Sequence, residues 1–184
     1  NISFNANDEA FLYVNYFSLK CNYIYGLAQK YENLIIDNSQ AFFCPPIRSI
    51  DTFYSARKFF GVPDGAYIYS RSKLKVSFEQ DYSSNRMAHL VNRIELGAEQ
   101  GYKDFVLNEK HLSNQPIRLM SKISNSILNN IDYEYVKKRR EDNFLYLHQH
   151  LSEINQLNID SRNICGPMVY PFLYEKDGLK EKLI

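Results

Sequence analysis

The chain has few cysteines, and their spacing indicates neither a disulfide framework nor a metal site. Only three occur among 184 residues, at Cys21, Cys44 and Cys165. Small secreted domains rely on closely spaced cysteine pairs, and structural zinc sites need Cys and His at short, regular spacings. Because neither pattern is present, the sequence predicts a cytoplasmic protein without a bound metal.

The sequence also lacks a strong net charge and a long apolar run. Lys and Arg number 22 and Asp and Glu number 21, which leaves a net charge of +1. This balance gives no reason to expect binding to nucleic acid or to an acidic membrane surface. No apolar run approaches the roughly 18 residues of a spanning helix, and no basic segment followed by an apolar one opens the chain, so neither membrane insertion nor secretion is expected.

What remains is the composition of a soluble globular protein. Hydrophobic residues make up 45% of the chain and charged residues 23%. A chain of this length can bury one sizeable core, or one core and part of a second. No internal repeat or low-complexity segment interrupts it, so fold and function must be sought in local patterns.

The most informative stretch begins with a short apolar run that ends in a carboxylate. Residues 34–36 are Leu, Ile and Ile, typical of a buried strand, and Asp37 follows directly. Gln40 comes three residues later, and a single turn of the chain after the strand would place it beside the carboxylate. In open α/β sheets, ligands bind at the carboxyl ends of the strands, so this is a candidate site.

A second predicted strand, residues 50–56, also ends in polar side chains. It carries Ser55 near its end, and Lys58 follows shortly after. A Pro-Asp-Gly sequence then favours a tight turn into a third short strand, residues 66–69. The order is therefore strand, acid, loop, strand, lysine, turn, strand.

Asp37-x-x-Gln40 followed by Ser55-x-x-Lys58 resembles the core of the fold-type I pyridoxal-phosphate (PLP) enzymes. More narrowly, it resembles the DegT/StrS-type sugar aminotransferases, although those usually place the lysine five residues after the serine rather than three. The resemblance implies that Lys58 holds PLP as an internal aldimine and that Asp37 pairs with the pyridinium nitrogen. It also implies that Gln40 contacts the ring hydroxyl and that Ser55 contacts the phosphate.

The residue types suit this chemistry. PLP acts as an electron sink, and a carboxylate keeps its ring nitrogen protonated. The lysine amine must be nucleophilic near neutral pH, which a partly buried site beside a cation such as Arg57 can arrange. Asn15, near the end of the preceding predicted strand, is a second candidate contact for the ring hydroxyl. Its alternative role is that of a strand-end asparagine that opens a turn.

The resemblance also implies a larger assembly. Enzymes of this type are about twice as long, so the chain is expected to lack the N-terminal half that grips the cofactor phosphate and to be inactive alone. Family members are homodimers with the site at the interface. The expected substrates are an amino donor and a keto sugar, in a nucleotide-linked form or as a similar small keto compound, which would place the enzyme in lipopolysaccharide or other sugar biosynthesis.

The remaining elements complete an α/β fold class. We expect a three-layer, mainly parallel sheet of the PLP-enzyme large domain over residues 1–131 and the start of a smaller α/β domain over 132–184. In the first part a strand at 10–17, a helix at 22–32 and the strand from Leu34 form a βαβ unit, so the two strands should be parallel. The other expected elements are helices at 83–97, 101–112, 116–128 and 133–154, a strand at 168–174 and a helix at 177–184.

Two other features of the helical region favour structural roles. The basic run at residues 137–140 is followed by two acids, so a solvated helix face is preferred over a phosphate or nucleic-acid site. His148 and His150 lie two positions apart, which directs them to different sides of a helix and argues against a shared metal.

Three alternatives to an aminotransferase stay open. Ser55 and Lys58 match the Ser-x-x-Lys pair of acyl-transfer enzymes, but the Ser-Asp-Asn and Lys-Thr-Gly elements of that class are absent. A catalytically inactive homologue that serves as a dimeric scaffold would keep the fold, although it has no reason to keep Lys58. A PLP enzyme with another reaction, such as dehydration of a sugar, would use the same residues.

Overall fold

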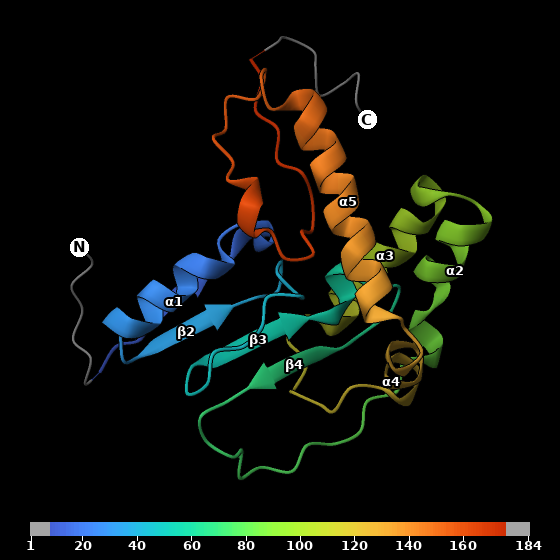
Figure 1. Ribbon diagram of the computed structural model, residues 1–184. Helices are drawn as coiled ribbons and strands as arrows, with labels where there is room; N and C mark the ends of the chain where they lie inside the picture. Colours follow the sequence, from blue (N-terminus) through green and yellow to red (C-terminus); the bar gives the residue numbers. More distant parts are fainter. Residues whose placement is uncertain (1–7, 176–184) are drawn as a thin grey trace.

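The computed structural model describes residues 8–175, which form a mixed α/β fold around a four-stranded sheet (Figure 1). The strands are β1 (Phe11–Val14), β2 (Leu34–Asp37), β3 (Asp51–Ser55) and β4 (Ala66–Tyr69), in that spatial order. The first three are parallel, and β4 runs antiparallel to β3. The predicted parallel β1–β2 unit and the predicted strand at 66–69 are therefore confirmed.

Helix α1 (Cys21–Lys30) covers one face of the sheet and forms the main core with it. Cys21, Ile24 and Leu27 point from the helix toward Leu34 and Ile36 of β2, and all five are buried. The helix is where the sequence predicted it. Its Tyr23 is exposed, while Cys21 in the same first turn is buried.

The helices beyond the sheet differ from the predicted ones mainly at their starts. They are α2 (Ala88–Glu95), α3 (Ala98–Leu112), α4 (Lys122–Asn129) and α5 (Tyr133–Leu151). The prediction of a helix from residue 116 was wrong, because residues 116–121 are extended and pair through Leu119 with Gln80. Ser121 then starts α4 by accepting the backbone N–H of Ser124.

The expected strand at residues 168–174 is absent. This segment instead runs back along α5 without sheet pairing. Asn155 holds it there, since its side chain donates to the Pro171 carbonyl and accepts the N–H of Leu173. The expected helix at 177–184 lies outside the described residues. The boundary proposed near Ile131 stays a prediction.

Aromatic side chains fix the loop after β2 against the segment after β3. Phe42 is at the centre, with its ring 4.9 Å from that of Phe60 and stacked on Tyr133 at the start of α5. Arg140 closes this cluster, because its guanidinium lies 4.7 Å from the Phe59 ring centroid and donates to the Phe59 carbonyl. Arg140 therefore does not belong to a solvated face, as the charge run had suggested, and it anchors α5 to the sheet domain.

Helices cover one face of the sheet, while side chains on the other face are exposed. Among residues 8–175, α1 and α5 both lie over the same face (Figure 1). The side chains that alternate toward the other face include Leu12 of β1 and Ile68 of β4, which are 52% and 58% exposed. Parallel strands are normally covered on both faces. The described residues thus supply two of the three expected layers.

Gly101 allows α2 and α3 to pack closely, and Gly101→Ala is expected to destabilise the fold. A Cβ there would lie 2.8 Å from the His89 carbonyl oxygen and 3.1 Å from the Arg93 backbone nitrogen. We expect the free energy of unfolding in urea to fall by about 1–3 kcal/mol, the usual cost of overpacking. Gly26→Ala is the matched control, because nothing lies within 4 Å of its Cβ position in α1. It should stabilise by roughly 0.5–1 kcal/mol, and an equal gain in both variants would contradict the packing argument.

Candidate functional site

The carboxyl ends of β1 and β2 bring two of the predicted site residues, Asn15 and Asp37, together. Asn15 follows β1, and its backbone N–H donates to the carbonyl of Asp37, the last residue of β2, at 3.0 Å. The Asn15 side chain is fully buried and donates to Asn38 Oδ1 at 3.0 Å. Asn38 in turn donates its N–H to the Phe53 carbonyl of β3. The loop after β2 is therefore tied to both neighbouring strands.

Lys58 is connected to Asp37 through one intervening serine. Lys58 Nζ donates to Ser39 Oγ at 3.0 Å, and the Ser39 backbone N–H donates to Asp37 Oδ1 at 2.7 Å. Lys58 ends a short 3₁₀ helix, η2 (Ala56–Lys58), directly after β3. Acid and amine thus come from neighbouring parallel strands and meet at one edge of the sheet. Within residues 8–175, no hydrogen bond reaches Asp37 Oδ2, so this oxygen can accept one from a ligand.

Two other predicted contacts have acceptor oxygens without a partner. Gln40 Oε1 and Asn15 Oδ1 are both buried, and neither accepts a hydrogen bond in the described part of the chain. A buried acceptor left unpaired costs about 1–3 kcal/mol, so such atoms mark positions where a bound donor is stabilising. Within residues 8–175 no hydrogen bond joins Gln40 to Asp37 or Lys58, and Gln40 follows Ser39 directly in the chain.

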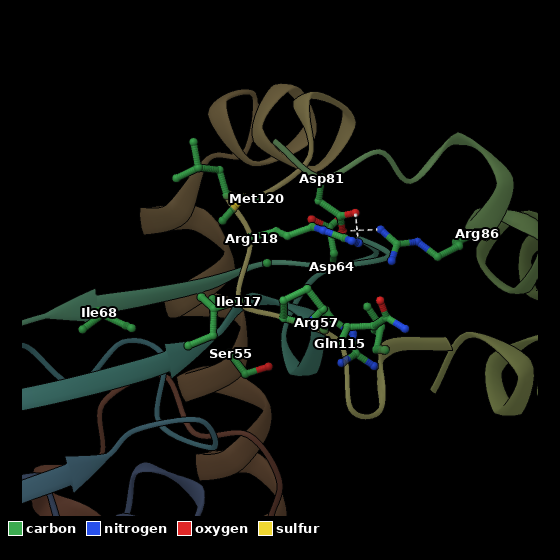
Figure 2. A pocket seen from close by; sticks show the side chains of 15 residues that line it. Ser55, Arg57, Asp64, Ile68, Asp81, Arg86, Gln115, Ile117, Arg118 and Met120 are labelled. Carbon is green, nitrogen blue, oxygen red and sulfur yellow. Dashed lines mark hydrogen bonds and ion pairs between the residues drawn. The ribbon is translucent and has the colours of Figure 1, made fainter. Parts of the chain in front are cut away.

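Ser55 lies on the other side of η2 from the Asp37–Ser39–Lys58 chain. It opens into a cavity of about 340 Å³, shown in Figure 2, between β4 and residues 115–120. No hydrogen bond joins Ser55 to Lys58 among residues 8–175, and the lysine is bound to Ser39 instead. The structure therefore gives no support to a Ser55–Lys58 acyl-transfer pair.

Charged side chains dominate the far wall of this cavity. Asp81 lies between Arg86 and Arg118, with Arg86 Nη2 at 2.6 Å and Arg118 Nη1 at 3.8 Å from its carboxylate oxygens (Figure 2). Burial alone would raise the pKa of Asp81, but the hydrogen bonds from Arg86 and from the Tyr82 N–H outweigh it and lower the pKa. Arg86 is itself buried, so this pair fixes the segment before α2.

Asp81→Asn is expected to weaken the fold at neutral pH and to reduce its sensitivity to acid. Because the folded-state pKa of Asp81 lies below the unfolded value, its contribution is present above about pH 4 and is lost as the pH falls through the folded pKa. We expect a loss of about 1.5–3 kcal/mol at pH 7, measured by urea unfolding, with a smaller difference from wild type at pH 2–3. If the difference in the free energy of unfolding between the two proteins were the same at pH 7 and at pH 2–3, the pKa of Asp81 would not be lowered in the folded state.

The environment of Lys58 differs from the expected one in two respects. Lys58 is exposed rather than partly buried, so the described residues do not shield its amine from water. Arg57, expected as a neighbouring cation, turns away and pairs with Glu109 of α3. Burial lowers the pKa of Arg57, yet its partner neutralises its charge. Any shielding of Lys58 must therefore come from a bound ligand or from groups outside residues 8–175.

Sequence reasoning missed the residue that connects the site. Ser39 contacts both Asp37 and Lys58, and it stands inside the Asp37-x-x-Gln40 motif at a position that the motif leaves unspecified. A serine two residues after a strand-end aspartate is a common signal for a turn in which the carboxylate accepts the serine N–H. That signal was available, but nothing in the sequence showed that Lys58 would lie opposite.

The residues at this edge fit PLP in their chemistry. A free carboxylate oxygen on Asp37 suits a protonated pyridine nitrogen, and the amine of Lys58 suits an aldehyde. The unpaired oxygen of either Gln40 or Asn15 suits a ring hydroxyl, which donates one hydrogen bond. Between residues 8 and 175, no group of three or more His, Cys, Asp or Glu side chains that could hold a metal ion occurs.

Comparison with known proteins found no relative of this chain. No family model, curated protein or solved structure matches the chain. In the part that the structure describes, no helix is long and apolar enough to cross a membrane. Any function must therefore be argued from the residues themselves.

Proposed function

We propose that the protein is a PLP-dependent aminotransferase of the fold-type I class that acts on a keto sugar or a similar small keto compound. One observation carries the proposal: Asp37 and Lys58, from the ends of adjacent parallel strands, are joined through Ser39. The mixed sheet is compatible with the large domain of such enzymes. Lys58 is the proposed attachment point, and a homodimer is the proposed assembly.

Each residue at the sheet edge has a distinct proposed role. PLP, when bound, supplies an electron sink that stabilises negative charge at the substrate carbon. Asp37 would hold a proton on the ring nitrogen, and either Gln40 or Asn15 would accept the one hydrogen bond that the ring hydroxyl can donate. Ser39 orients the amine of Lys58, because its hydroxyl accepts the lysine N–H. Lys58 would act as the general base and acid that moves the proton of the substrate carbon.

The proposal is tested by titrating the full-length protein, with the N-terminal half that the resemblance implies, with PLP and recording the near-ultraviolet and visible absorbance. Wild type should give a band distinct from free PLP, and adding an amino-acid donor should change it. Asp37→Asn should still give a band but should react with the donor on the order of 10²–10³ times more slowly, because the ring nitrogen loses its counter-charge. A wild-type spectrum identical to free PLP would overturn the proposal.

Two related functions are separated by the same titration. An inactive scaffold would show no band and no response to a donor. A PLP enzyme with another reaction, such as sugar dehydration, would show the band but would not release a keto acid from the donor. Transamination stays the proposal, and release of a keto acid from the donor is the result that separates it from dehydration.

A further inference from the structure

A second and larger cavity lies on the Lys58 side of η2. It has a volume of about 520 Å³ and is formed between residues 57–62 and the helices α2 and α3. This size is within the usual range of small-molecule sites. Lys58 is on one wall, and Arg93 of α2 is on another. Lys58 therefore lines this cavity, and no other residue assigned to PLP does.

The charge of this cavity is one-sided. Its lining includes three cations, Arg57, Lys58 and Arg93, and no carboxylate. Glu109 compensates Arg57, but between residues 8 and 175 no acid lies within ion-pair distance of Lys58 or Arg93. Two uncompensated cations across a concave space attract an anion more strongly than the same charges on a flat surface. An arginine also presents a fork of donors that matches phosphate and carboxylate.

A buried histidine and an aromatic wall complete the lining. His89 is 8% exposed, and its Nδ1 has no hydrogen-bond partner. Burial lowers the pKa of His89. The Phe105 ring lies 6.0 Å from His89 and 6.2 Å from Tyr102, which gives one side of the cavity an apolar surface.

We propose that this cavity binds a small molecule with a phosphate or carboxylate group on Arg93 and an apolar or ring portion against Tyr102 and Phe105. Bound in this way, the molecule would extend toward Lys58 on the opposite wall. The identification of this molecule as the substrate rests on the proposed function. The preference for an anion rests only on the charges of the cavity.

The test measures binding of phenyl phosphate, benzoate and the neutral benzyl alcohol to the full chain by isothermal titration calorimetry. Phenyl phosphate or benzoate should bind wild type at least about tenfold more tightly than benzyl alcohol, and the tighter anion identifies the charged group. Arg93→Gln should weaken that binding about tenfold, and Arg93→Lys should restore only part of it, because lysine keeps the charge and loses the fork of donors. Arg139→Gln removes another exposed arginine, on α5 and outside the cavity, and should change nothing. Equal affinity for the neutral probe, or binding unchanged by Arg93→Gln, would overturn the proposal.

A second arm separates this inference from the PLP assignment. The titration is repeated on protein treated with PLP and borohydride, which fixes any cofactor on a lysine. If the anion still binds and still depends on Arg93, the cavity is a separate anion site, as proposed. If loading removes the binding, Arg93 serves the cofactor phosphate and the inference fails. If Lys58 takes up no PLP, the proposed function fails, while binding that depends on Arg93 still supports the anion site.

Discussion

Replacing Lys58 with Ala is expected to abolish the PLP absorbance band and to reduce the reaction with amino donors by at least about 10³-fold. The amine both attaches the cofactor and moves the proton, so removing it eliminates two steps at once. The fold should survive, because Lys58 is exposed and makes one hydrogen bond, to Ser39. The measurement is the rate of keto-acid formation from an amino-acid donor by the full-length protein in the presence of added PLP.

The matched control is Lys138→Ala. Lys138 is an exposed lysine on α5 that pairs with Asp142 one turn away. Its loss should cost less than about 0.5 kcal/mol and should leave the reaction unchanged. Equal activity in Lys58→Ala and wild type would show that the amine at the sheet edge has no catalytic role.

Replacing Asp64 with Ala is expected to have the largest effect on stability, about 3–5 kcal/mol. Asp64 is 5% exposed and accepts three hydrogen bonds, from the Ser121 N–H and hydroxyl at 2.7 Å each and from the Ser124 hydroxyl at 2.5 Å. The carboxylate thereby ties the β3–β4 turn to the first turn of α4. Its removal leaves several buried donors without an acceptor, which is among the most costly changes to a core.

Urea unfolding of Asp64→Ala and Asp132→Ala measures this effect against a matched change. Asp132 is exposed and caps α5 by accepting the Tyr135 N–H, so its loss should cost about 1 kcal/mol. A larger loss for Asp132→Ala than for Asp64→Ala would show that the cluster at α4 does not carry the stability assigned to it.

The sheet could be predicted because its strands are short apolar runs with clear ends. Leu34 to Asp37 is a buried strand with a polar stop, and the Pro-Asp-Gly turn leaves few alternatives for the chain that follows. A helix connects β1 to β2. Because parallel strands need a crossover connection of this kind, the sequence predicted that the two strands pair in parallel. Local pattern and global topology agree in this part of the chain.

The later segments were harder to predict because distant contacts decide them. Residues 168–174 have the composition of a strand, but side chains of the α5 region hold them without a pairing partner. Arg140 looked like part of a charged face and is instead bound over Phe59. Likewise, Arg93 and Lys58 are far apart in sequence, and only the α2–α3 packing brings them to one cavity. Periodicity carries no information about such contacts.

The most direct test of the central claim is peptide mass spectrometry after incubation with PLP and reduction with borohydride. The account predicts one stable pyridoxyl adduct, on the peptide that contains Lys58, and none on that peptide in the Lys58→Ala variant. Asp37→Asn should still form the adduct, because Asp37 acts on the ring nitrogen rather than on attachment. An adduct spread evenly over the exposed lysines, or none at Lys58, would contradict the assignment of this sheet edge to PLP.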